Sequence, residues 1–390
     1  MEKKIAAQYV FTNCGQPIRN GLVTYDSECG RILDIQPLNH ETANTGHFNG
    51  VLIPGFVNAH CHLELSHMKG LIPPCGHLID FLQSISHYQG SMEFSADSCI
   101  NADRCMYQNG ISLCGDISNT ADSATVKRYS KISYVNFIEL IGTTPERILR
   151  NRDTYNKVSE VFAANGQNNL CAVPHAPYSV SPAMFEAIND INAGRRSLVS
   201  IHNQETEAEN ELYISHTGSI AERFPLNLNT IPTTGKRSLE SYAGQLKDYE
   251  TVLLVHNTFS RRVDFEIAVR QLKNPYFVLC PKSNLYLENA LPDLDTMLDM
   301  NLNICLGTDS LSSNDTLSIL EEMKVLRRNF RQLSFDRLLA MATINGARAL
   351  RQQDGFGQLT PGKSPGLLLL ENFDFQEMNI CEETTVRRIC

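Results

Sequence analysis

Residues 51–62 read Val-Leu-Ile-Pro-Gly-Phe-Val-Asn-Ala-His-Cys-His, an apolar run followed at once by two histidines. Within this stretch, residues 51–57 have the length and composition of a buried strand. Seven more runs of strand length follow along the chain, so eight strands are expected in all. These further runs are residues 111–116, 132–139, 170–174, 198–202, 251–256, 276–280 and 303–307.

Stretches with helical periodicity lie between several of these runs. From Phe335 to Ala342, for example, apolar residues recur at i, i+3, i+4 and i+7, and Ser334 is expected to cap that helix. Strands that alternate with helices predict a parallel sheet, and eight such units in about 300 residues fit a closed (β/α)₈ barrel. An open doubly wound sheet is the alternative, but no G-x-G-x-x-G motif follows the first strand.

The two ends of the chain differ from this middle part. Residues 1–50 contain short β-type segments separated by Asn, Gly, Pro and Ser, and residues 351–390 have a similar pattern. We therefore expect the two ends to form one small discontinuous β-sandwich domain, with the barrel at 51–350 between them. Residues 209–245 lack clear periodicity and are interrupted by Pro and Gly, so we expect a long loop that acts as a lid over the barrel mouth.

Composition excludes several classes of protein. The 34 Lys and Arg against 43 Asp and Glu give a net charge of −9, and no run of basic residues suggests a nucleic-acid groove. No apolar run reaches the roughly 20 residues of a membrane helix, and no secretory signal is visible at the N-terminus. The twelve cysteines form no C-x-x-C pair. Reduced thiols in a cytoplasmic protein are therefore expected.

The two histidines after the first run are the first candidate metal ligands. In an extended chain, residues i and i+2 point to the same face, so His60 and His62 should project together into the barrel. Two imidazoles that converge there need a partner, and a divalent metal is the natural one. The H-x-H pattern alone is weak, but its position directly after an apolar strand strengthens it.

Three later runs also end in ionisable residues. Because catalytic groups of such barrels come from the carboxyl ends of the strands, these residues are candidates for the same site. Each of them alone is more often a core histidine, a helix cap or a solvated carboxylate, and only their joint occurrence favours a site. The residues are His202 and Glu205 after the fifth run, His256 at the end of the sixth and Asp309 after the eighth.

Together these residues predict metal-dependent hydrolysis. His60, His62, His202 and Asp309 make a set suited to one zinc or iron ion with a position left for water. Such a metal makes a water molecule nucleophilic near neutral pH. Asp309 could take the proton of that water, and Glu205 could carry a proton to the substrate if its pKa is raised.

Several motifs resemble the amidohydrolase superfamily, and within it the mononuclear deaminase and chlorohydrolase branch. The motifs run in family order through nearly the whole chain. They are P-G-F-V-N-A-H-C-H-L-E-L-S from residue 54, P-H-A-P-Y-S-V-S at 174–181, H-N-Q-E at 202–205, V-H-N at 255–257, L-G-T-D-S-L-S-S-N at 306–314, A-T-I-N-G-A-R-A-L at 342–350 and G-Q-L-T-P-G-K at 357–363.

The resemblance implies roles for individual residues. His256 would orient or stabilise the attacking water, His175 would contact the substrate ring, and Asn284 would also belong to the substrate site. Asn284 ends a C-P-K-S-N run at 280–284 where the family commonly has C-P-R-S-N, and Lys cannot replace the bidentate Arg fork. Binuclear relatives carry a carboxylated lysine on the fourth strand, and residues 170–174 contain none, which favours one metal.

The expected reaction is the hydrolytic deamination of an amino-substituted nitrogen heterocycle. The run H-L-E-L-S-H at 62–67 looks closest to aminodeoxyfutalosine-deaminase-like and adenosine-type members, which indicates a purine nucleoside-like substrate. Glu64 in that run either reads a ribose hydroxyl or ring amine, or pairs with a neighbour at the rim. Dechlorination of a triazine, hydrolysis of a cyclic amide and a silent metal-binding regulatory role stay open. A homodimer is the default oligomer.

Overall fold

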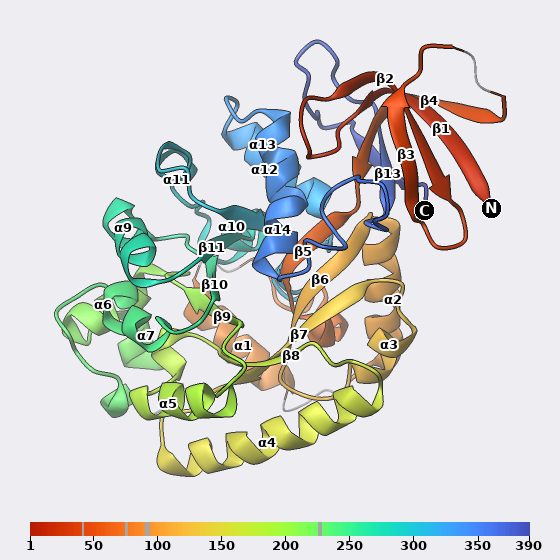
Figure 1. The fold of residues 1–390 in the computed structure, drawn as a ribbon. Helices are drawn as coiled ribbons and strands as arrows, with labels where there is room; N and C mark the ends of the chain where they lie inside the picture. The colour runs from red at the N-terminus through yellow and green to blue at the C-terminus, as the bar shows by residue number, and fades with distance from the viewer. Residues whose placement is uncertain (41–42, 75–76, 90–93, 225–227) are drawn as a thin grey trace.

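The predicted strands form the wall of a parallel barrel (Figure 1). The computed structural model describes residues 1–390 except 41–42, 75–76, 90–93 and 225–227. The barrel wall consists of two parallel four-stranded sheets, in the orders β5-β6-β7-β8 and β9-β10-β11-β12. The strands are β5 (Phe56–Cys61), β6 (Ile111–Ser118), β7 (Ser133–Leu140), β8 (Leu170–Pro174), β9 (Leu198–Asn203), β10 (Thr251–His256), β11 (Pro275–Leu279) and β12 (Ile304–Leu306).

Two seams close these sheets into a ring. At one seam the backbone amide of His202 donates to the carbonyl oxygen of His175 over 2.9 Å. At the other seam the amides of Thr308 and Asp309 donate to the carbonyl oxygen of His60 over 3.0 and 3.1 Å. Both seams therefore lie at residues that the sequence predicts for the active site.

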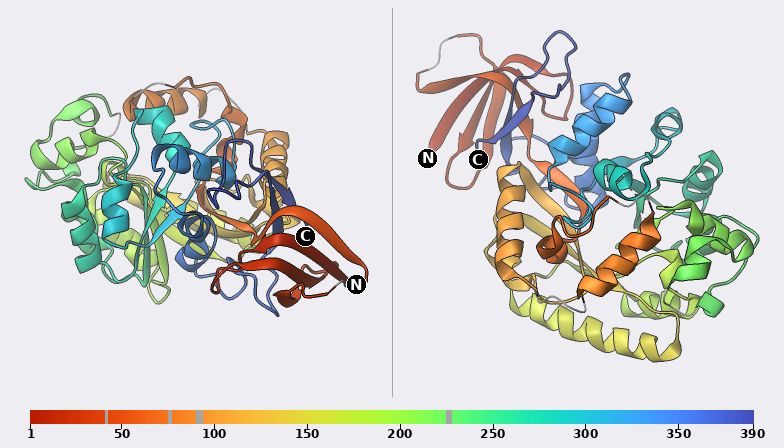
Figure 2. Two further views of the ribbon diagram at one scale, coloured as in Figure 1. Left: turned by 90° about the horizontal axis from the view of Figure 1, so that it is seen from above. Right: turned by 180° about the vertical axis from the view of Figure 1, so that it is seen from behind.

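A separate six-stranded sheet is built from both ends of the chain, in the order β14-β13-β4-β1-β2-β3. Figures 1 and 2 show the two termini close together on this sheet, beside the barrel. One of its faces buries a small apolar cluster that includes Val10, Val23 and Leu367. Its strands are β1 (Glu2–Val10), β2 (Ile18–Asp26), β3 (Ile32–Pro37), β4 (Thr45–Pro54), β13 (Leu367–Glu371) and β14 (Thr385–Arg388).

The apolar run at 51–57 is divided between the two sheets, whereas the sequence predicted one strand. Residues up to Pro54 end β4 and pair with β13, and β5 begins the barrel at Phe56. Between them, Gly55 donates its amide to the carbonyl oxygen of Gly366 over 3.1 Å. A Cβ at Gly55 would overlap the backbone of Pro365 and the side chain of Ser112. Both strands are buried, so the run is apolar on either side of Gly55. The sequence therefore does not show that the chain passes from one sheet to the other at this residue.

Helices cover the outside of the barrel and one of its ends (Figures 1 and 2). Helix α13 begins directly after Ser334 as predicted, but the Ser334 side chain makes no capping hydrogen bond; the periodic apolar residues of the helix are buried. No helix in the described part of the chain is long and apolar enough to cross a membrane. The helices are α1 (Leu78–Gln89), α2 (Ala96–Gln108), α3 (Ala124–Tyr129), α4 (Pro145–Ala164), α5 (Pro182–Ile191), α6 (Glu207–Ser215), α7 (Gly218–Arg223), α8 (Ser238–Tyr242), α9 (Arg262–Gln271), α10 (Pro281–Glu288), α11 (Leu294–Asp299), α12 (Ile319–Asn329), α13 (Phe335–Ala342) and α14 (Ile344–Ala349), with 3₁₀ turns at Leu63–Met68, Pro177–Ser179, Leu228–Thr230 and Ala243–Gln245.

Residues 209–245 are not the irregular loop that the sequence predicted, because α6, α7 and α8 occupy most of the described segment. Its helices bury polar side chains, and this breaks the apolar periodicity. Glu209 and Asn210 are fully buried and are bonded to neighbouring backbone and side chains: the amides of Gln204 and Ser238 donate to Glu209 Oε1 (3.0 Å) and Asn210 Oδ1 (3.2 Å). Phe224 of this segment lines the cavity described below.

Candidate active site

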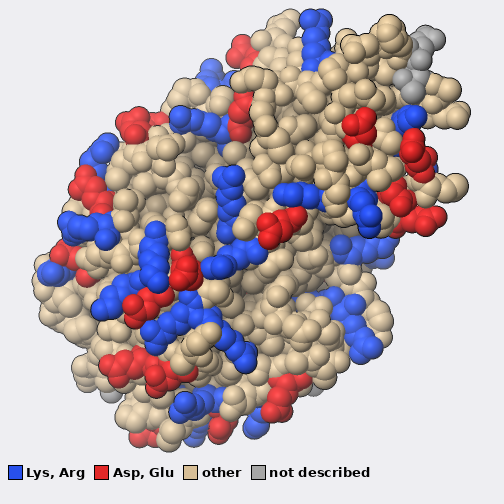
Figure 3. Space-filling view, in the orientation of Figure 1, with Lys and Arg blue, Asp and Glu red and all other residues tan. Residues whose placement is uncertain are grey.

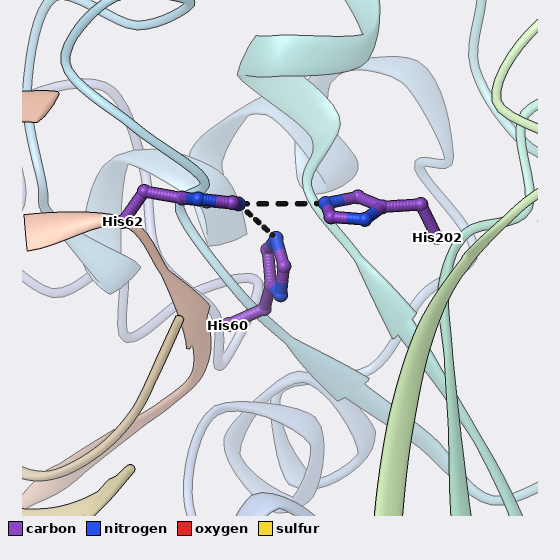
Figure 4. Close-up of side chains that lie close together, drawn as sticks. All are labelled: His60, His62 and His202. Atoms are coloured by element: carbon purple, nitrogen blue, oxygen red, sulfur yellow. Dashed lines mark hydrogen bonds between the residues drawn. The ribbon is translucent and has the colours of Figure 1, made fainter. Parts of the chain in front are cut away.

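Three histidines converge at the carboxyl ends of β5 and β9. His60 lies on β5, His62 follows that strand directly, and His202 lies on β9. Their Nε2 atoms face one another, at 3.2 Å between His60 and His62 and 3.4 Å between His62 and His202 (Figure 4). All three side chains are buried. As predicted from their i, i+2 spacing, the side chains of His60 and His62 therefore project to the same side.

Asp309 completes the set from the far side of the barrel seam. Its Oδ1 lies 3.6 Å from His60 Nε2 and 3.5 Å from His62 Nε2. Its Oδ2 accepts hydrogen bonds from Ser283 Oγ at 2.7 Å and Ser313 Oγ at 2.5 Å. The two hydroxyls fix the carboxylate, so that one oxygen is held in place and the other faces the histidines.

The four side chains fit a divalent metal. Ligands placed tetrahedrally at about 2.0–2.1 Å from zinc lie about 3.3–3.4 Å apart, which is close to the separations seen here. Burial and neighbouring His60 lower the pKa of His62 to about 3, so its imidazole is neutral. His202 Nδ1 lies 2.7 Å from the carbonyl oxygen of His175 and donates to it, which leaves Nε2 as a free lone pair. Lone pairs that converge in a buried site repel one another unless a cation lies between them.

Glu205 and His256 stand beside this cluster. His256 Nε2 lies 3.4 Å from Glu205 Oε1, and both side chains are buried. Burial, reinforced by the negative charge of Asp309, raises the pKa of Glu205 well above its usual range, which favours the protonated form of this carboxyl group. A protonated carboxyl group in a catalytic cavity can act as a general acid.

The backbone at these strand ends is strained. Asp309 has φ of +57°, His256 has φ of +72° and Gln204, next to Glu205, has φ of +46°. Residues other than glycine adopt this left-handed region at a cost of about 1–3 kcal/mol, and such residues cluster at functional sites. The strain marks the three strand ends at which the sequence predicts catalytic groups.

These groups share one cavity of about 330 Å³. Of the predicted residues, the structure brings His62, His175, His202, Glu205, His256 and Asp309 to its wall. His60 lies behind them as a buried member of the metal cluster. His175 Nδ1 lies 2.7 Å from Ser179 Oγ, and burial lowers the pKa of this histidine to about 4. His175 is therefore neutral and presents its ring to the cavity.

The structure does not bring Glu64 and Asn284 to the described cavity wall. The carboxylate of Glu64 accepts hydrogen bonds from the amides of Asn119 and Thr120 and from the Thr120 hydroxyl, at 2.9–3.2 Å. Asn284 Oδ1 accepts from His256 Nδ1 at 2.8 Å. Glu64 therefore positions Asn119, and Asn284 positions His256. Asn119 and His256 both line the cavity.

Glu139 is a cavity residue that the sequence motifs did not indicate. It is the last residue of the predicted run 132–139. His202 was selected because it is an ionisable residue at the carboxyl end of a predicted strand, and the same criterion selects Glu139. Asn119 donates to its Oε2 at 2.8 Å, and its buried Oε1 lacks a hydrogen-bond partner but lies 3.7 Å from His202 Nδ1. Burial raises the pKa of Glu139 to about 7. A carboxyl oxygen in the cavity wall that lacks a hydrogen-bond partner is suited to a hydroxyl or amine donor of a ligand.

A buried lysine lies close to the segment that carries the two histidines. Lys127, on α3, is buried, but its Nζ lies 2.5 Å from Asp116 Oδ2 and donates to Asn136 Oδ1 at 2.7 Å. Asp116 Oδ1 in turn accepts from the amide of Leu63, next to His62, at 2.8 Å. This ion pair therefore helps to fix the segment that carries His60 and His62.

Comparison with known proteins agrees with this geometry. The model of the amidohydrolase family matches residues 51–386. The chain belongs to the amidohydrolase family. The match spans the barrel and most of the terminal segment. It confirms the family and the barrel fold that the motifs predicted.

Similar members of the family are named as deaminases. An adenosine deaminase of Helicobacter pylori is 28% identical over 317 residues, which cover 79% of this chain and 76% of that protein. An aminodeoxyfutalosine deaminase of Nitratiruptor sp. is 29% identical over 339 residues, which cover 83% and 79%. The crystal structure of Helicobacter pylori aminofutalosine deaminase with methylthio-coformycin has a TM-score of 0.80 and 25% identity, and the match covers 94% of this chain and 92% of that one. The prediction of a hydrolase acting on carbon–nitrogen bonds is confirmed.

Proposed function

We propose that this protein is a hydrolytic deaminase of a purine nucleoside-like substrate that works with one zinc ion. The observation that carries the proposal is the meeting of three histidines, Asp309 and Glu205, whose pKa is raised by burial, at one buried cavity. Relatives named adenosine deaminase and aminodeoxyfutalosine deaminase support the substrate class. A cavity of about 330 Å³ is at the lower end of the range for small-molecule sites.

His60, His62, His202 and Asp309 would hold the metal, and zinc suits three imidazoles and a carboxylate better than hard cations do. Iron is the second choice. A divalent metal bound there lowers the pKa of water towards neutrality. The protein side chains then only need to place the substrate and move protons.

Glu205 donates its proton to a ring nitrogen of the substrate, which makes the amine-bearing carbon electrophilic. Water adds to that carbon, and its proton passes to the Asp309 oxygen that faces the histidines. Asp309 then passes the proton that it took from water to the exocyclic amine, the carbon–nitrogen bond breaks and ammonia leaves, while the hydroxyl group on the carbon becomes a carbonyl and returns its proton to Glu205. His256, held by Asn284 through Nδ1, keeps Nε2 directed at Glu205 and the attacking water.

Substrate contacts come from the rest of the wall. We propose that His175 contacts the heterocycle, because its neutral ring faces the cavity. Glu139, whose Oε1 has no hydrogen-bond partner, would accept a hydrogen bond from the sugar. We propose positioning roles for Glu64 and Asn284, because their hydrogen bonds already engage Asn119 and His256.

The other reactions are weaker alternatives. Hydrolysis of a cyclic amide is disfavoured because β8 offers no lysine for a second metal. A silent regulatory protein would have no need for a buried Glu205 with a raised pKa beside His256 at the histidine cluster. Dechlorination changes only the leaving group, so the same cavity would serve, and only the choice of substrate separates it from deamination.

The experiment is a product screen with the zinc-loaded protein. Ammonia and chloride release are measured from adenine nucleosides, guanine, cytosine and chlorinated s-triazines. We expect ammonia from at least one adenine nucleoside. Chloride release without ammonia would establish the dechlorinating alternative, and no product from any of them would overturn the proposal.

The remaining predictions concern location and partners. All eleven cysteines in the described part of the chain are free thiols, which supports the proposed cytoplasmic location. On the face shown in Figure 3, basic and acidic side chains are interspersed, which supports a small molecule rather than nucleic acid as the partner. We retain the homodimer as a proposal, testable by light scattering.

A further inference from the structure

Glu322 is a buried carboxyl group that the proposed reaction does not use. It lies in the first turn of α12, where that helix packs against α10 (Figure 1). Its side chain is fully buried, and within the described part of the chain no Lys, Arg or His forms an ion pair with it. Burial raises the pKa of Glu322 to about 8. Burying a carboxyl group costs free energy unless hydrogen bonds compensate for the lost water, so the bonds of Glu322 indicate what it does.

The two oxygens of Glu322 bond to two different segments of the chain. Oε2 accepts a hydrogen bond from the backbone amide of Lys282 at 2.8 Å, at the start of α10. Oε1 accepts from Nδ2 of Asn314 at 2.9 Å, in the loop that follows β12. An apolar side chain of the same size would leave both N–H groups buried without an acceptor. One carboxyl group therefore links the start of α10 to the loop after β12.

The start of α10 carries two residues that orient groups of the active site. Ser283 directly follows Lys282, and its hydroxyl donates to Asp309 Oδ2 at 2.7 Å. Asn284 is the next residue, and its Oδ1 accepts from His256 Nδ1 at 2.8 Å. Any shift of the backbone at Lys282 therefore moves the partners of both Asp309 and His256.

The loop after β12 gives a second route to Asp309. Asn314 Nδ2 donates to Glu322 and also to the carbonyl oxygen of Thr308 at 2.9 Å, and Thr308 directly precedes Asp309. Ser313, next to Asn314, donates to Asp309 Oδ2 at 2.5 Å. Because both hydrogens of the Asn314 side-chain amide are used, rotation of that side chain would break both bonds. Glu322 thus reaches Asp309 from α10 and from the loop.

We propose that Glu322 is a positioning residue of the active site. It fixes the start of α10 and the loop after β12 relative to each other, so that Asp309 faces the histidine cluster and His256 keeps Nε2 directed at Glu205. Glu322 is not among the described residues of the cavity wall, so it acts through these neighbours and not on the substrate. Its expected effect on turnover rests on the proposed function, whereas its expected effect on metal binding requires only that Asp309 is a ligand.

The first test measures zinc affinity by competition between the metal-free protein and a chromophoric chelator. Glu322→Leu removes both acceptors at similar volume, and Glu322→Gln keeps one acceptor oxygen. We expect Glu322→Leu to weaken zinc binding by about 10-fold, the lower end of the range for groups that orient a ligand, and Glu322→Gln to weaken it less. The matched control is Glu321→Leu, because the partly exposed carboxylate of Glu321 pairs with Lys324 and should not affect zinc. Parental affinity in folded Glu322→Leu would overturn the inference.

A second control separates positioning from a general loss of stability. Asn192 is also a buried hydrogen-bonding side chain, but its Nδ2 donates to the carbonyl oxygen of Ala172 (2.8 Å) and to Tyr249 Oη (2.9 Å), and Tyr249 precedes the amino end of β10. Asn192→Leu should lower the midpoint of urea denaturation and leave zinc affinity unchanged. An equal loss of zinc affinity in Asn192→Leu would overturn the inference. If Glu322→Leu does not fold, Glu322→Gln is compared with the same controls, and parental affinity in it has the same meaning.

A combined variant tests the route through the two serines. If Ser283 and Ser313 transmit the effect, Glu322→Leu should weaken zinc binding less in the Ser283→Ala/Ser313→Ala background than in the parent. Full multiplication of the two effects would exclude this route and overturn the inference.

Turnover of the zinc-loaded protein gives the last measurement. In Glu322→Leu, kcat for ammonia release should fall at least 10-fold with KM near the parental value, because the described cavity wall is unchanged. A rise in KM with parental kcat would contradict the positioning role. If the parent itself releases no ammonia from any nucleoside, the proposed function fails, and the zinc affinities alone then decide the role of Glu322.

Discussion

The backbone amide of Asp309 donates a hydrogen bond to the carbonyl oxygen of His60 over 3.1 Å, where the first and last barrel strands meet. Two proposed metal ligands that are 249 positions apart in the sequence therefore also close the barrel. Gly307 makes this approach possible, because a Cβ there would lie 2.9 Å from both the carbonyl oxygen and the Cβ of His60. Closure of the barrel and geometry of the metal site are thus coupled.

Replacing Gly307 should disturb both properties. A methyl group at this point forces the strands apart, and such overpacking costs about 1–3 kcal/mol. We expect Gly307→Ala to lower the midpoint of chemical denaturation and to weaken zinc binding, measured by competition with a chromophoric chelator. The control is Gly244→Ala, where a Cβ meets nothing within 4 Å. Unchanged zinc affinity in Gly307→Ala would contradict the coupling.

Much of the site is predictable from the sequence because parallel strands deliver their carboxyl ends to one place. This single rule brings together His60, His62, His202 and Asp309, and the same rule at residue 139 adds Glu139. The rule works because strand direction and barrel closure are global properties that do not depend on the identities of the loops.

The features that the sequence did not predict depend on which neighbouring groups already occupy a side chain or cover a surface. The carboxylate of Glu64 could accept a hydrogen bond from a ribose hydroxyl. Its oxygens, however, already accept hydrogen bonds from two backbone amides in the loop that follows β6. The apolar residues of α1 have clear helical periodicity, yet periodicity does not say whether that face meets protein or an empty cavity. The break between β4 and β5 at Gly55 was not predicted, because the residues on both sides of it are apolar and buried.

The buried pair between Lys127 and Asp116 supports the segment of the two histidines. Lys127→Met should cost about 3–5 kcal/mol of unfolding free energy, because it leaves the Asp116 carboxylate buried without a cation. The double variant with Asp116→Asn should recover part of that loss, since the Asn side-chain oxygen can still accept from the amide of Leu63. Urea denaturation of both variants, beside the exposed Lys157→Met, measures this cycle. A single variant as stable as the parent would refute the role of the pair.

Glu205→Gln should retain the metal and lose turnover. The amide is isosteric but has no proton to give at neutral pH, and general acid catalysis of this kind contributes about 10²–10⁴-fold to the rate. Glu207→Gln, two residues along and outside the described cavity wall, is the matched control and should keep its rate. Ammonia release and metal content are measured together. Parental activity of Glu205→Gln would remove the proton-transfer role.

Metal content distinguishes one ion from two. The buried cluster of three histidines and Asp309 predicts one equivalent of metal per chain, and chelation should abolish ammonia release until zinc is restored. Elemental analysis of the purified protein, followed by titration of the metal-free protein, gives the number. A value near two equivalents would show that a second ion binds without a lysine ligand on β8.

The two serines that bond Asp309 should control how well the site holds its metal. Ser283 and Ser313 donate to the same oxygen, so each alone can partly compensate for loss of the other. We expect each alanine variant to weaken zinc binding only modestly, and the double variant Ser283→Ala/Ser313→Ala to weaken it by about 10–100-fold, as is typical for groups that orient a ligand. Chelator competition measures the affinity, and Ser159→Ala, at a partly exposed position of α4, is the control. If the double variant binds zinc like the parent, then β12, its seam with β5 and the strained backbone at Asp309 suffice to orient the carboxylate.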